Sequence, residues 1–344
     1  MSASMAERTL TQRELNRALL ARQLLLERTR LPLPRVLERM GGLQAQYAPS
    51  MYIGLWSRMD RFERGDLDRA LERRTVAQGT LMRTTIHLVS ARDYWPFALG
   101  IRRSRREWWL RLQKGAVDDV TMRRSAAHVR RLLQTGPRPV KELEEHATGY
   151  FGLWLDLVRV PPSGTWERRR ADLYETAEAW LGPSDVSEQE GMEHIARRYL
   201  GAFGPAPPAD IATWAAIPVT RVAQTLRRLA LRRFRDEAGR ELVDLPRAPL
   251  PDPETAAPVR FLPVWDAILL VHARRTEVLP EEYRRRLFSA QNPASASTFL
   301  VDGAVAGTWR HDRGRIALEP FRRLSRPTRV ELEAEAERLA ELYR

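Results

Sequence analysis

Two glutamines, Gln44 and Gln46, are the residues of this sequence whose type and spacing best fit a chemical role. They lie in the segment Gly-Gly-Leu-Gln-Ala-Gln-Tyr-Ala-Pro (41–49), where glycines and a proline interrupt an apolar-periodic stretch over 33–40. Residues i and i+2 point to different sides of a helix but to the same side of an extended segment. An extended segment would therefore turn both neutral amides toward one cleft. The alternative is a helix C-terminus with two solvated glutamines.

Other reactive groups are scarce in the chain. It has no cysteine among 344 residues, which excludes disulfides, thiolate catalysis and zinc sites built on cysteine. It also lacks a P-loop, a G-x-S-x-G motif, a Rossmann fingerprint and an H-E-x-x-H pair. The histidines are scattered, at positions 87, 128, 146, 194, 272 and 311. We therefore expect no metal site and no cofactor.

The chain is strongly basic, with 57 Lys and Arg against 44 Asp and Glu and a formal net charge of +13. Only Lys114 and Lys141 are lysines, so nearly all of the positive charge is arginine, whose planar guanidinium suits phosphate oxygens. A basic surface of this kind predicts a polyanionic partner. The alternative is a soluble protein made arginine-rich by the codon bias of a GC-rich genome. Because no apolar N-terminal region and no run of 18 apolar residues is present, we expect a cytoplasmic protein without a signal peptide or membrane span.

The region that carries the glutamines has the pattern of several helices followed by a hairpin. Apolar periodicity predicts its helices over 10–28, from 34, over 51–59 and over 66–74. Thr11 and Glu14 form a capping box at the start of the first helix, and Asp66 is the expected N-cap of the fourth. Residues 80–89 are rich in β-branched side chains and predict a strand or hairpin.

A long basic helix over 93–112 follows, and a second repeat of the same order comes after it. We expect Trp95, Trp108 and Trp109 to pack inward, while the arginines form a basic face at positions 102, 103, 105, 106 and 111. The second repeat has helices over 121–134 and 140–147, an apolar segment over 150–158, a loop tip at 161–166 and three arginines, 168–170. A Pro/Gly tip with flanking arginines suits a wing lying along phosphates, and it is also typical of an ordinary solvated hairpin.

The third repeat is the clearest, and a β-rich region ends the chain. Three helices precede a hairpin, over 188–203, 208–214, 221–231 and 234–245. The last region predicts a strand near 261–270, an Asp-Gly hairpin over 299–309, a strand at 315–318 and a closing helix from 327. Helices followed by a hairpin are the order of a winged helix-turn-helix. We therefore predict an α+β, mainly α fold with tandem winged helix-turn-helix motifs and a C-terminal small β-barrel-like region.

The predicted boundaries divide the chain into five parts. The first winged helix, with the glutamines and the hairpin, covers 9–115. The second and third cover 116–183 and 184–247. A proline-rich linker over 248–258 leads to the C-terminal β-rich region and its closing helix, 259–344.

One known family shares several of these segments. The glutamine segment, the hairpin Leu-Met-Arg-Thr-Thr-Ile-His-Leu-Val (81–89) and the segments 261–266 and 301–309 resemble the AlkZ/YcaQ-type winged-helix DNA glycosylases, over about residues 10–320. The family places a Gln-x-Gln or Gln-x-Asp catalytic motif where this chain has its two glutamines. The chain is similar to the Gln-x-Gln branch, which includes members that unhook interstrand crosslinks. Ala45 replaces a bulkier apolar residue and Thr84 replaces a glycine, so the substrate range stays open.

The resemblance implies a monofunctional DNA glycosylase that excises N7-alkylated purines from double-stranded DNA and could unhook crosslinks. Alkylation at N7 makes the purine cationic, so the base leaves as a neutral molecule and no strong carboxylate base is obligatory. A positioned water and complementary dipoles suffice. Gln44 and Gln46 would jointly hold that water against C1′ of the sugar. DNA contacts are expected from Arg83, Thr84, Thr85, His87, Arg102, Arg106, Arg168, Arg169 and Arg170.

We expect such an enzyme to act as a monomer in the cytoplasm, associated with the nucleoid. Two alternatives share the basic charge and the winged helices. One is a non-catalytic DNA-binding protein, either a regulator or an architectural factor. The other is a scaffold that has lost activity, which the departures at Ala45 and Thr84 would accompany. Only the glutamine pair distinguishes the enzyme, since a regulator has no use for two amides at the floor of a cleft.

Overall fold

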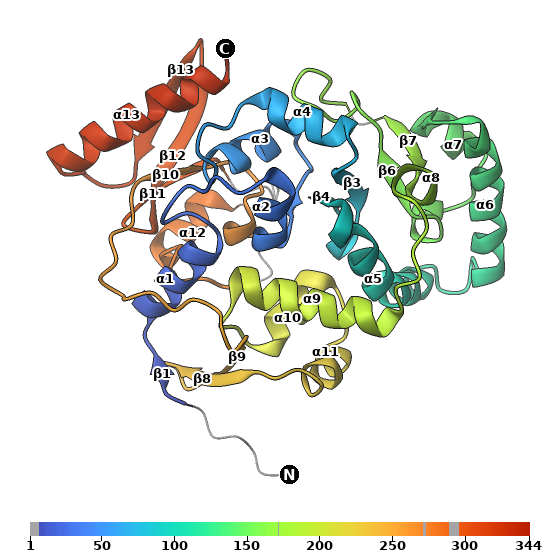
Figure 1. Cartoon of the computed structure of the whole chain (residues 1–344), viewed down its shortest axis with the longest axis horizontal. Helices are drawn as coiled ribbons and strands as arrows, with labels where there is room; N and C mark the ends of the chain where they lie inside the picture. The colour runs from blue at the N-terminus through green and yellow to red at the C-terminus, as the bar shows by residue number, and fades with distance from the viewer. Residues whose placement is uncertain (1–6, 171, 271–272, 289–295) are drawn as a thin grey trace.

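The computed structural model describes residues 7–170, 172–270, 273–288 and 296–344, so that His272 lies outside the described residues. The described strands form three sheets, and helices surround them (Figure 1). One sheet has six strands in the order β2-β4-β3-β6-β7-β5, one has the order β1-β8-β9, and one has the order β10-β11-β12-β13. The predicted mixture of helices and strands is confirmed. The winged-helix assignment and the domain boundaries stay predictions.

The N-terminal helices have the predicted order with shifted ends. The capping box of Thr11 and Glu14 is confirmed, but the first helix stops at Arg22. The predicted N-cap of the fourth helix, Asp66, was wrong by one turn, because Glu63 is the N-cap. Asp66 is the third helical residue, and its carboxylate accepts from the Glu63 N–H at 2.9 Å. The four helices are α1 (Gln12–Arg22), α2 (Leu33–Met40), α3 (Ala48–Trp56) and α4 (Arg64–Glu72).

The predicted hairpin exists and supplies the second and third strands of the six-stranded sheet. Strands β3 (Val76–Thr80) and β4 (Ile86–Ser90) pair antiparallel around a tight turn, η1 (Met82–Thr84). The short strand β2 (Leu43–Gln44) pairs with the other edge of β4. On the far side, β3 pairs with β6, so the sheet continues from the first predicted domain into the second through β6 (Leu157–Arg159), β7 (Leu173–Thr176) and β5 (Arg138–Pro139).

Two long helices, α5 (Ala91–Leu112) and α9 (Glu188–Phe203), pack against each other, and α5 also packs against β3 and β4 (Figure 1). The two helices approach closely at Gly100 and Gly191, where a Cβ on Gly100 would lie 2.6 Å from the Gly191 carbonyl carbon. Glycine at both positions therefore permits the contact. The second repeat packs a small core of its own beside α5, from α6 (Asp119–Leu132), η2 (Leu133–Thr135), α7 (Val140–Glu145) and η3 (Phe151–Leu153), whereas α8 (Ala177–Leu181) packs into the main core.

The third repeat has the predicted order of three helices and a hairpin. After α9 come α10 (Pro208–Ala215), α11 (Val219–Leu226), β8 (Arg232–Asp236) and β9 (Glu241–Asp244). Strand β1 (Thr9–Leu10) adds to β8 in parallel, which ties the start of the described chain to this repeat. The proline-rich segment then runs along α1, where Arg22 donates to the Pro249 carbonyl at 2.9 Å and Arg17 donates to the Thr255 carbonyl at 2.7 Å.

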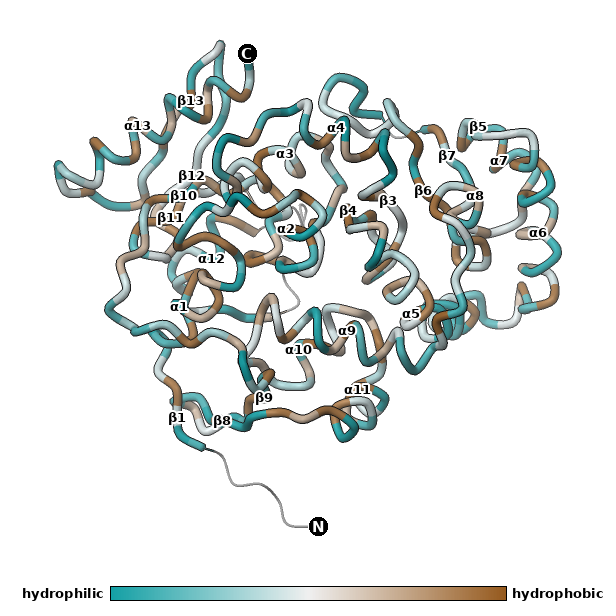
Figure 2. Tube along the Cα trace, in the orientation of Figure 1, coloured by the Kyte–Doolittle hydropathy of each residue, from teal (hydrophilic) through white to brown (hydrophobic). Residues whose placement is uncertain are grey.

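The C-terminal region is an open antiparallel sheet, and the prediction of a barrel was wrong for the part of the chain that the structure describes. Its edge strands, β10 and β13, do not pair with each other there. The predicted Asp-Gly turn is confirmed: Asp302 and Gly303 have φ of +48° and +80°. Hydrophobic and hydrophilic residues alternate along the closing helix (Figure 2). Its buried leucines cover the sheet, so the sheet need not close into a barrel. The elements are β10 (Arg260–Leu262), η4 (Ala267–Leu269), α12 (Glu281–Leu287), β11 (Thr298–Val301), β12 (Ala304–Asp312), β13 (Arg315–Pro320) and α13 (Arg326–Leu342).

Bilayer-spanning segments need a long helix of high hydropathy. Among the described residues, none of the helices combines that length with that hydropathy.

Candidate active site

A pair of glycines brings the glutamine segment onto the hairpin. Helix α2 ends at Gly41, whose φ of +75° is left-handed, and Gly42 follows with φ of +84°. The Gly42 N–H closes the helix end by donating to the Leu37 carbonyl at 2.9 Å. A Cβ on Gly42 would lie 2.9 Å from Cγ1 of Val89, so a larger residue would push the segment off β4. The glycines thus turn the chain from a helix into an edge strand.

The glutamine segment is extended, as the cleft-facing interpretation requires. Gln44 pairs with His87 in the antiparallel ladder of β2 and β4, and the Ala45 N–H donates to the Ile86 carbonyl at 2.7 Å. The alternative of a helix C-terminus with two solvated glutamines is wrong for Gln44, which is 5% exposed. Gln46 is exposed, so one amide lies in the protein interior and the other at its surface.

Each glutamine uses its amide oxygen to hold the hairpin. Oε1 of Gln44 accepts from Nη2 of Arg83 at 3.0 Å, and Oε1 of Gln46 accepts from the Ile86 N–H at 3.2 Å. Both partners can only donate, so the chemistry fixes which end of each amide is the oxygen. Neither NH₂ group has a hydrogen-bond partner within the described part of the chain. Each amide therefore keeps two N–H donors and a second oxygen lone pair for a water or a ligand.

Arg83 is a half-buried cation that is held by neutral oxygens. Besides Gln44, its Nη1 donates to the carbonyl of Trp214 at 2.6 Å. That carbonyl belongs to the last turn of α10, where the helix dipole supplies a partial negative charge. Burial, and then the charge of Arg275, lowers the pKa of Arg83 to about 10, although it stays protonated at neutral pH. No carboxylate pairs with it among the described residues, and three of its five N–H donors are unused.

The hairpin tip that carries Arg83 has a left-handed backbone at two successive residues. Arg83 and Thr84 have φ of +53° and +56°, a region that costs about 1–2 kcal/mol for a residue with a Cβ. Two threonine hydroxyls offset part of this: Oγ1 of Thr84 donates to the Arg83 carbonyl at 2.6 Å, and Oγ1 of Thr85 donates to the Met82 carbonyl at 3.0 Å. The tip is thereby fixed in the conformation that aims Arg83 at Gln44.

His87 lies inside the protein rather than on the predicted DNA-facing surface. It is 2% exposed, and its Nδ1 is 3.0 Å from the Thr85 carbonyl. A carbonyl only accepts, so Nδ1 carries the proton and Nε2 is bare. Burial, helped by the charge of Arg83, lowers the pKa of His87 to about 3, which keeps the imidazole neutral. In this conformation it cannot contact a phosphate as a cation.

The three arginines after the second repeat's loop tip have different surroundings. Nη1 of Arg169 donates to the hydroxyl of Tyr47 at 3.3 Å, and its guanidinium lies 5.8 Å from the Tyr47 ring centroid. Arg169 is thereby placed beside the residue that follows Gln46. Arg168 instead pairs with Asp172 at 3.2 Å, and Arg170 is exposed.

A buried tyrosine anchors this loop. The Trp166 N–H donates to the hydroxyl of Tyr52 at 3.1 Å, and that hydroxyl donates to the Asp68 carboxylate at 2.5 Å. Burial, and then the hydrogen bond to Asp68, raises the pKa of Tyr52 well above its usual value, so the hydroxyl keeps its proton. The part of the tip from Ser163 to Trp166 is therefore buried against α3 and α4, while Pro162 and the residues 167–170 are exposed.

Two predicted DNA contacts on α5 have internal partners. Arg102 pairs with Asp156 at 2.5 Å, and Arg106 donates to the Leu153 carbonyl at 2.9 Å. Both guanidinium groups thus hold the second repeat against α5, and the structure does not bring them to the glutamines. Whether any of the predicted residues contacts DNA stays a prediction.

Sequence reasoning missed a cavity of about 450 Å³ beside the hairpin tip. Trp108 lines it and is 43% exposed, so the expectation that this tryptophan packs inward was wrong. The Trp214 carbonyl that holds Arg83 was also missed, because backbone groups carry no signal in sequence. Within the described residues, no three His, Asp or Glu side chains are arranged to hold a metal ion.

Comparisons with known proteins identify a family and a similar fold. A sequence model of a family described as "DNA glycosylase AlkZ-like" matches residues 37–342. Among solved structures, the fold is similar to that of the Streptomyces sahachiroi DNA glycosylase AlkZ, with a TM-score of 0.81 and 19% identity over 97% of each chain. No curated protein matches the sequence significantly.

Proposed function

Because the chain belongs to the AlkZ-like DNA glycosylase family, we propose that it excises N7-alkylated purines from double-stranded DNA by using Gln44 and Gln46 to position the attacking water. Family membership supports a hydrolase of N-glycosyl bonds that acts on DNA. The choice of N7 adducts rests on their chemistry. Alkylation at N7 gives the purine a positive charge, so the base departs as a neutral molecule and its departure needs no strong acid.

The observation that carries the proposal is the hydrogen bond from Arg83 to Gln44. It orients the amide so that the second lone pair of Oε1 can accept a hydrogen bond from water, while the NH₂ can donate to the DNA backbone. The negative end of the amide dipole then complements positive charge at C1′ as the glycosidic bond breaks. A fixed amide also removes the entropic cost of orienting the water at each turnover.

Arg83 itself suits a phosphate near the lesion. Its charge is partly desolvated, it has no carboxylate partner among the described residues, and three of its N–H donors are unused. A phosphate oxygen would satisfy such a group better than water does at a half-buried position. Arg169, beside Tyr47, provides a second cation on the exposed side of Gln46. The two arginines could thus align the DNA strand across the glutamine segment.

A monofunctional reaction is supported by the scarcity of amines. Glycosylases that also cleave the strand through a covalent imine need an amine nucleophile. The chain has only Lys114 and Lys141, and neither makes a contact with the glutamine segment or the hairpin tip among the described residues. Water is then the nucleophile that the site can supply.

Crosslink unhooking is the extension of this activity that we propose next. A base that is tied to both strands cannot swing freely out of the helix, as most glycosylases require. A catalytic segment with one exposed amide, Gln46, could reach such a base without fully enclosing it.

The test is an adduct panel with purified protein: DNA that contains N7-methylguanine, N3-methyladenine, a bulky N7 adduct or an N7 interstrand crosslink. We expect base release from the N7 adducts, with binding that weakens steeply as salt rises. Binding without release from any of the four substrates would instead identify a non-catalytic DNA-binding protein. Release limited to N3-methyladenine would contradict the N7 assignment.

A further inference from the structure

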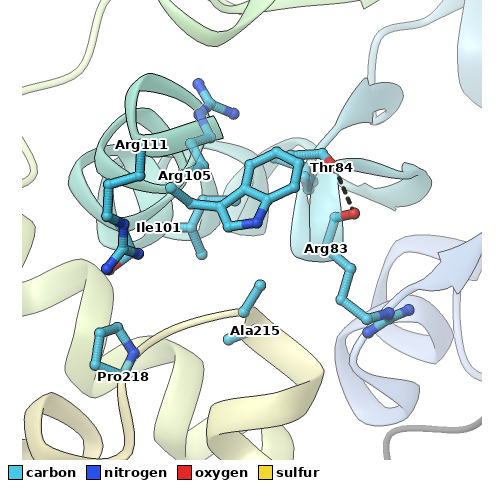
Figure 3. A pocket seen from close by; sticks show the side chains of 11 residues that line it. Arg83, Thr84, Ile101, Arg105, Arg111, Ala215 and Pro218 are labelled. Atoms are coloured by element: carbon cyan, nitrogen blue, oxygen red, sulfur yellow. Dashed lines mark hydrogen bonds between the residues drawn. The ribbon is translucent and has the colours of Figure 1, made fainter. Parts of the chain in front are cut away.

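The cavity beside the hairpin tip has an uncovered aromatic face. It lies between the tip, α5 and the turn that joins α10 to α11 (Figure 3), and most of its wall is apolar, from Leu81, Ile101, Ala215 and Pro218. Trp108 lines it and is 43% exposed. Indole faces stack readily on planar rings, and such stacking is the usual sequence-independent contact of proteins with unpaired bases. The cavity is therefore shaped for a flat, largely apolar group.

The charged groups of this cavity are all positive. Arg83, Arg105 and Arg111 contribute to its lining, and no carboxylate does. Arg105 is neutralised by Asp156 at 2.6 Å. Arg111 is exposed, and its guanidinium makes no hydrogen bond or ion pair in the described part of the chain. This charge pattern disfavours a cationic guest and favours a neutral ring that is attached to an anion.

We propose that this cavity receives a neutral nucleobase displaced from the DNA duplex, which stacks on Trp108 while its phosphate contacts Arg111. A base with its phosphate combines the flat ring and the negative charge that the lining favours. The N7-alkylated purine is itself cationic, so the guest is an unmodified base beside or opposite the lesion. The inference rests on the proposed function in that it takes DNA as the ligand.

The position of the cavity connects this base to the glutamines. Arg83 and Thr84 line the cavity (Figure 3). From that wall, the Arg83 guanidinium donates to Gln44. A base in the cavity would press on the strained tip and hold Arg83 against Gln44. Removal of a neighbouring base from the stack would also open the duplex where the glutamines must reach C1′. The cavity therefore helps the protein to enter the helix without a pocket for the damaged base.

Photocrosslinking tests this proposal independently of catalysis. A duplex with 5-iodouracil opposite a tetrahydrofuran abasic analogue presents one unpaired base and contains nothing to excise. After irradiation and proteolysis, we expect mass spectrometry to locate the crosslink at Trp108. Trp108→Ala should abolish that crosslink and Trp108→Phe should retain part of it. Leu112→Ala, which changes an exposed residue on the same helix outside the cavity, should crosslink as the wild type does.

Binding gives a second measurement. The ratio of affinities for the duplex with one unpaired base and the fully paired duplex should fall roughly tenfold in Trp108→Ala, and should not change in Leu112→Ala. A crosslink that maps elsewhere, or a ratio that Trp108→Ala leaves unchanged, would overturn the proposal. Circular dichroism of each variant verifies its folding, and Trp108→Phe replaces Trp108→Ala should the latter unfold.

Base release from N7-methylguanine separates this inference from the proposed function. A crosslink at Trp108 without base release by the wild type would reject the enzymatic activity alone. Base release by the wild type without a crosslink at Trp108 would reject the cavity's role alone.

Discussion

The guanidinium of Arg83 donates to the amide oxygen of Gln44 at 3.0 Å, across 39 residues of sequence. This bond joins the strained hairpin tip to β2, the strand that Gly41 and Gly42 place against β4. Because the arginine can only donate, this bond turns the amide oxygen of Gln44 toward Arg83 and the NH₂ group away from it. The arrangement makes Arg83 a positioning residue for Gln44, and the end of α10 holds Arg83 in turn through the Trp214 carbonyl.

Replacement of Arg83 should therefore impair base release. We expect Arg83→Met to lower the single-turnover rate on N7-methylguanine DNA by on the order of tenfold to a hundredfold, since the Gln44 amide is then free to rotate. Arg83→Lys should recover only a small part of this, because an ammonium cannot bridge the two oxygens in the same planar geometry. Arg124→Ala, at an exposed arginine of α6 that is not a predicted DNA contact, is the control for lost charge. A rate in Arg83→Met equal to that of the wild type would reject the positioning role.

Thr84 is expected to tolerate glycine. Its φ of +56° suits glycine, so Thr84→Gly should leave the free energy of unfolding unchanged or raise it by up to about 1 kcal/mol. Thr80→Gly, in strand β3, should lower it by about 1 kcal/mol. Urea unfolding of the two variants measures the difference. If Thr84→Gly were the less stable of the two, the tip would not be strained at this residue.

His87 should make the protein less stable in mild acid. Its pKa is about 3 in the folded protein, below the unfolded value of about 6.5, so the unfolded chain binds the proton first as pH falls. The stabilisation is complete above pH 6.5 and is lost toward pH 3, by about 2 kcal/mol between pH 7 and pH 5. Urea unfolding at both pH values should show a smaller loss in His87→Gln. His128→Gln, on α6, should lose as much stability as the wild type, and an unaltered loss in His87→Gln would contradict the assignment.

Loss of the buried ion pair between Arg58 and Asp266 should lower the free energy of unfolding more than loss of an exposed pair does. Both side chains are fully buried and are joined by two hydrogen bonds of 2.9 Å. Asp266→Asn leaves a buried guanidinium without its counter-charge and should lower the free energy of unfolding by about 3–5 kcal/mol. Asp60→Asn breaks the exposed pair with Arg30 and should cost less than about 1 kcal/mol. Denaturant titration distinguishes them, and equal losses would show that burial does not set the strength of these pairs.

Local signals predicted many of the elements. The capping box of Thr11 and Glu14, the Asp302-Gly303 turn and the order of elements in the third repeat depend on neighbouring residues, and the structure has them. The barrel was wrong because alternating strands are equally compatible with an open sheet that a helix such as α13 covers. The sheet that continues through β3 and β6, and the parallel addition of β1 to β8, depend on distant contacts that no local pattern encodes.

At the candidate site, sequence pattern located the glutamine segment but not the surroundings of its residues. The glycines and the proline around Gln44 left both an extended segment and a helix C-terminus open. The burial of His87 could not be predicted, because it follows from the register that pairs it with Gln44. Trp108 was expected inside because tryptophans usually are, and only the packing of α5 against the α10–α11 turn leaves its ring at a cavity.

The most direct test of the catalytic assignment is single-turnover base release from N7-methylguanine DNA by Gln44→Ala, Gln46→Ala and the double variant. Gln224→Ala, at an exposed glutamine of α11, is the control. We expect the double variant to lose roughly a hundredfold or more of the wild-type rate, since a single dipole of this kind contributes on the order of a hundredfold, while DNA binding is retained. A double variant that releases base at the wild-type rate would show that the two glutamines do not hold the attacking water.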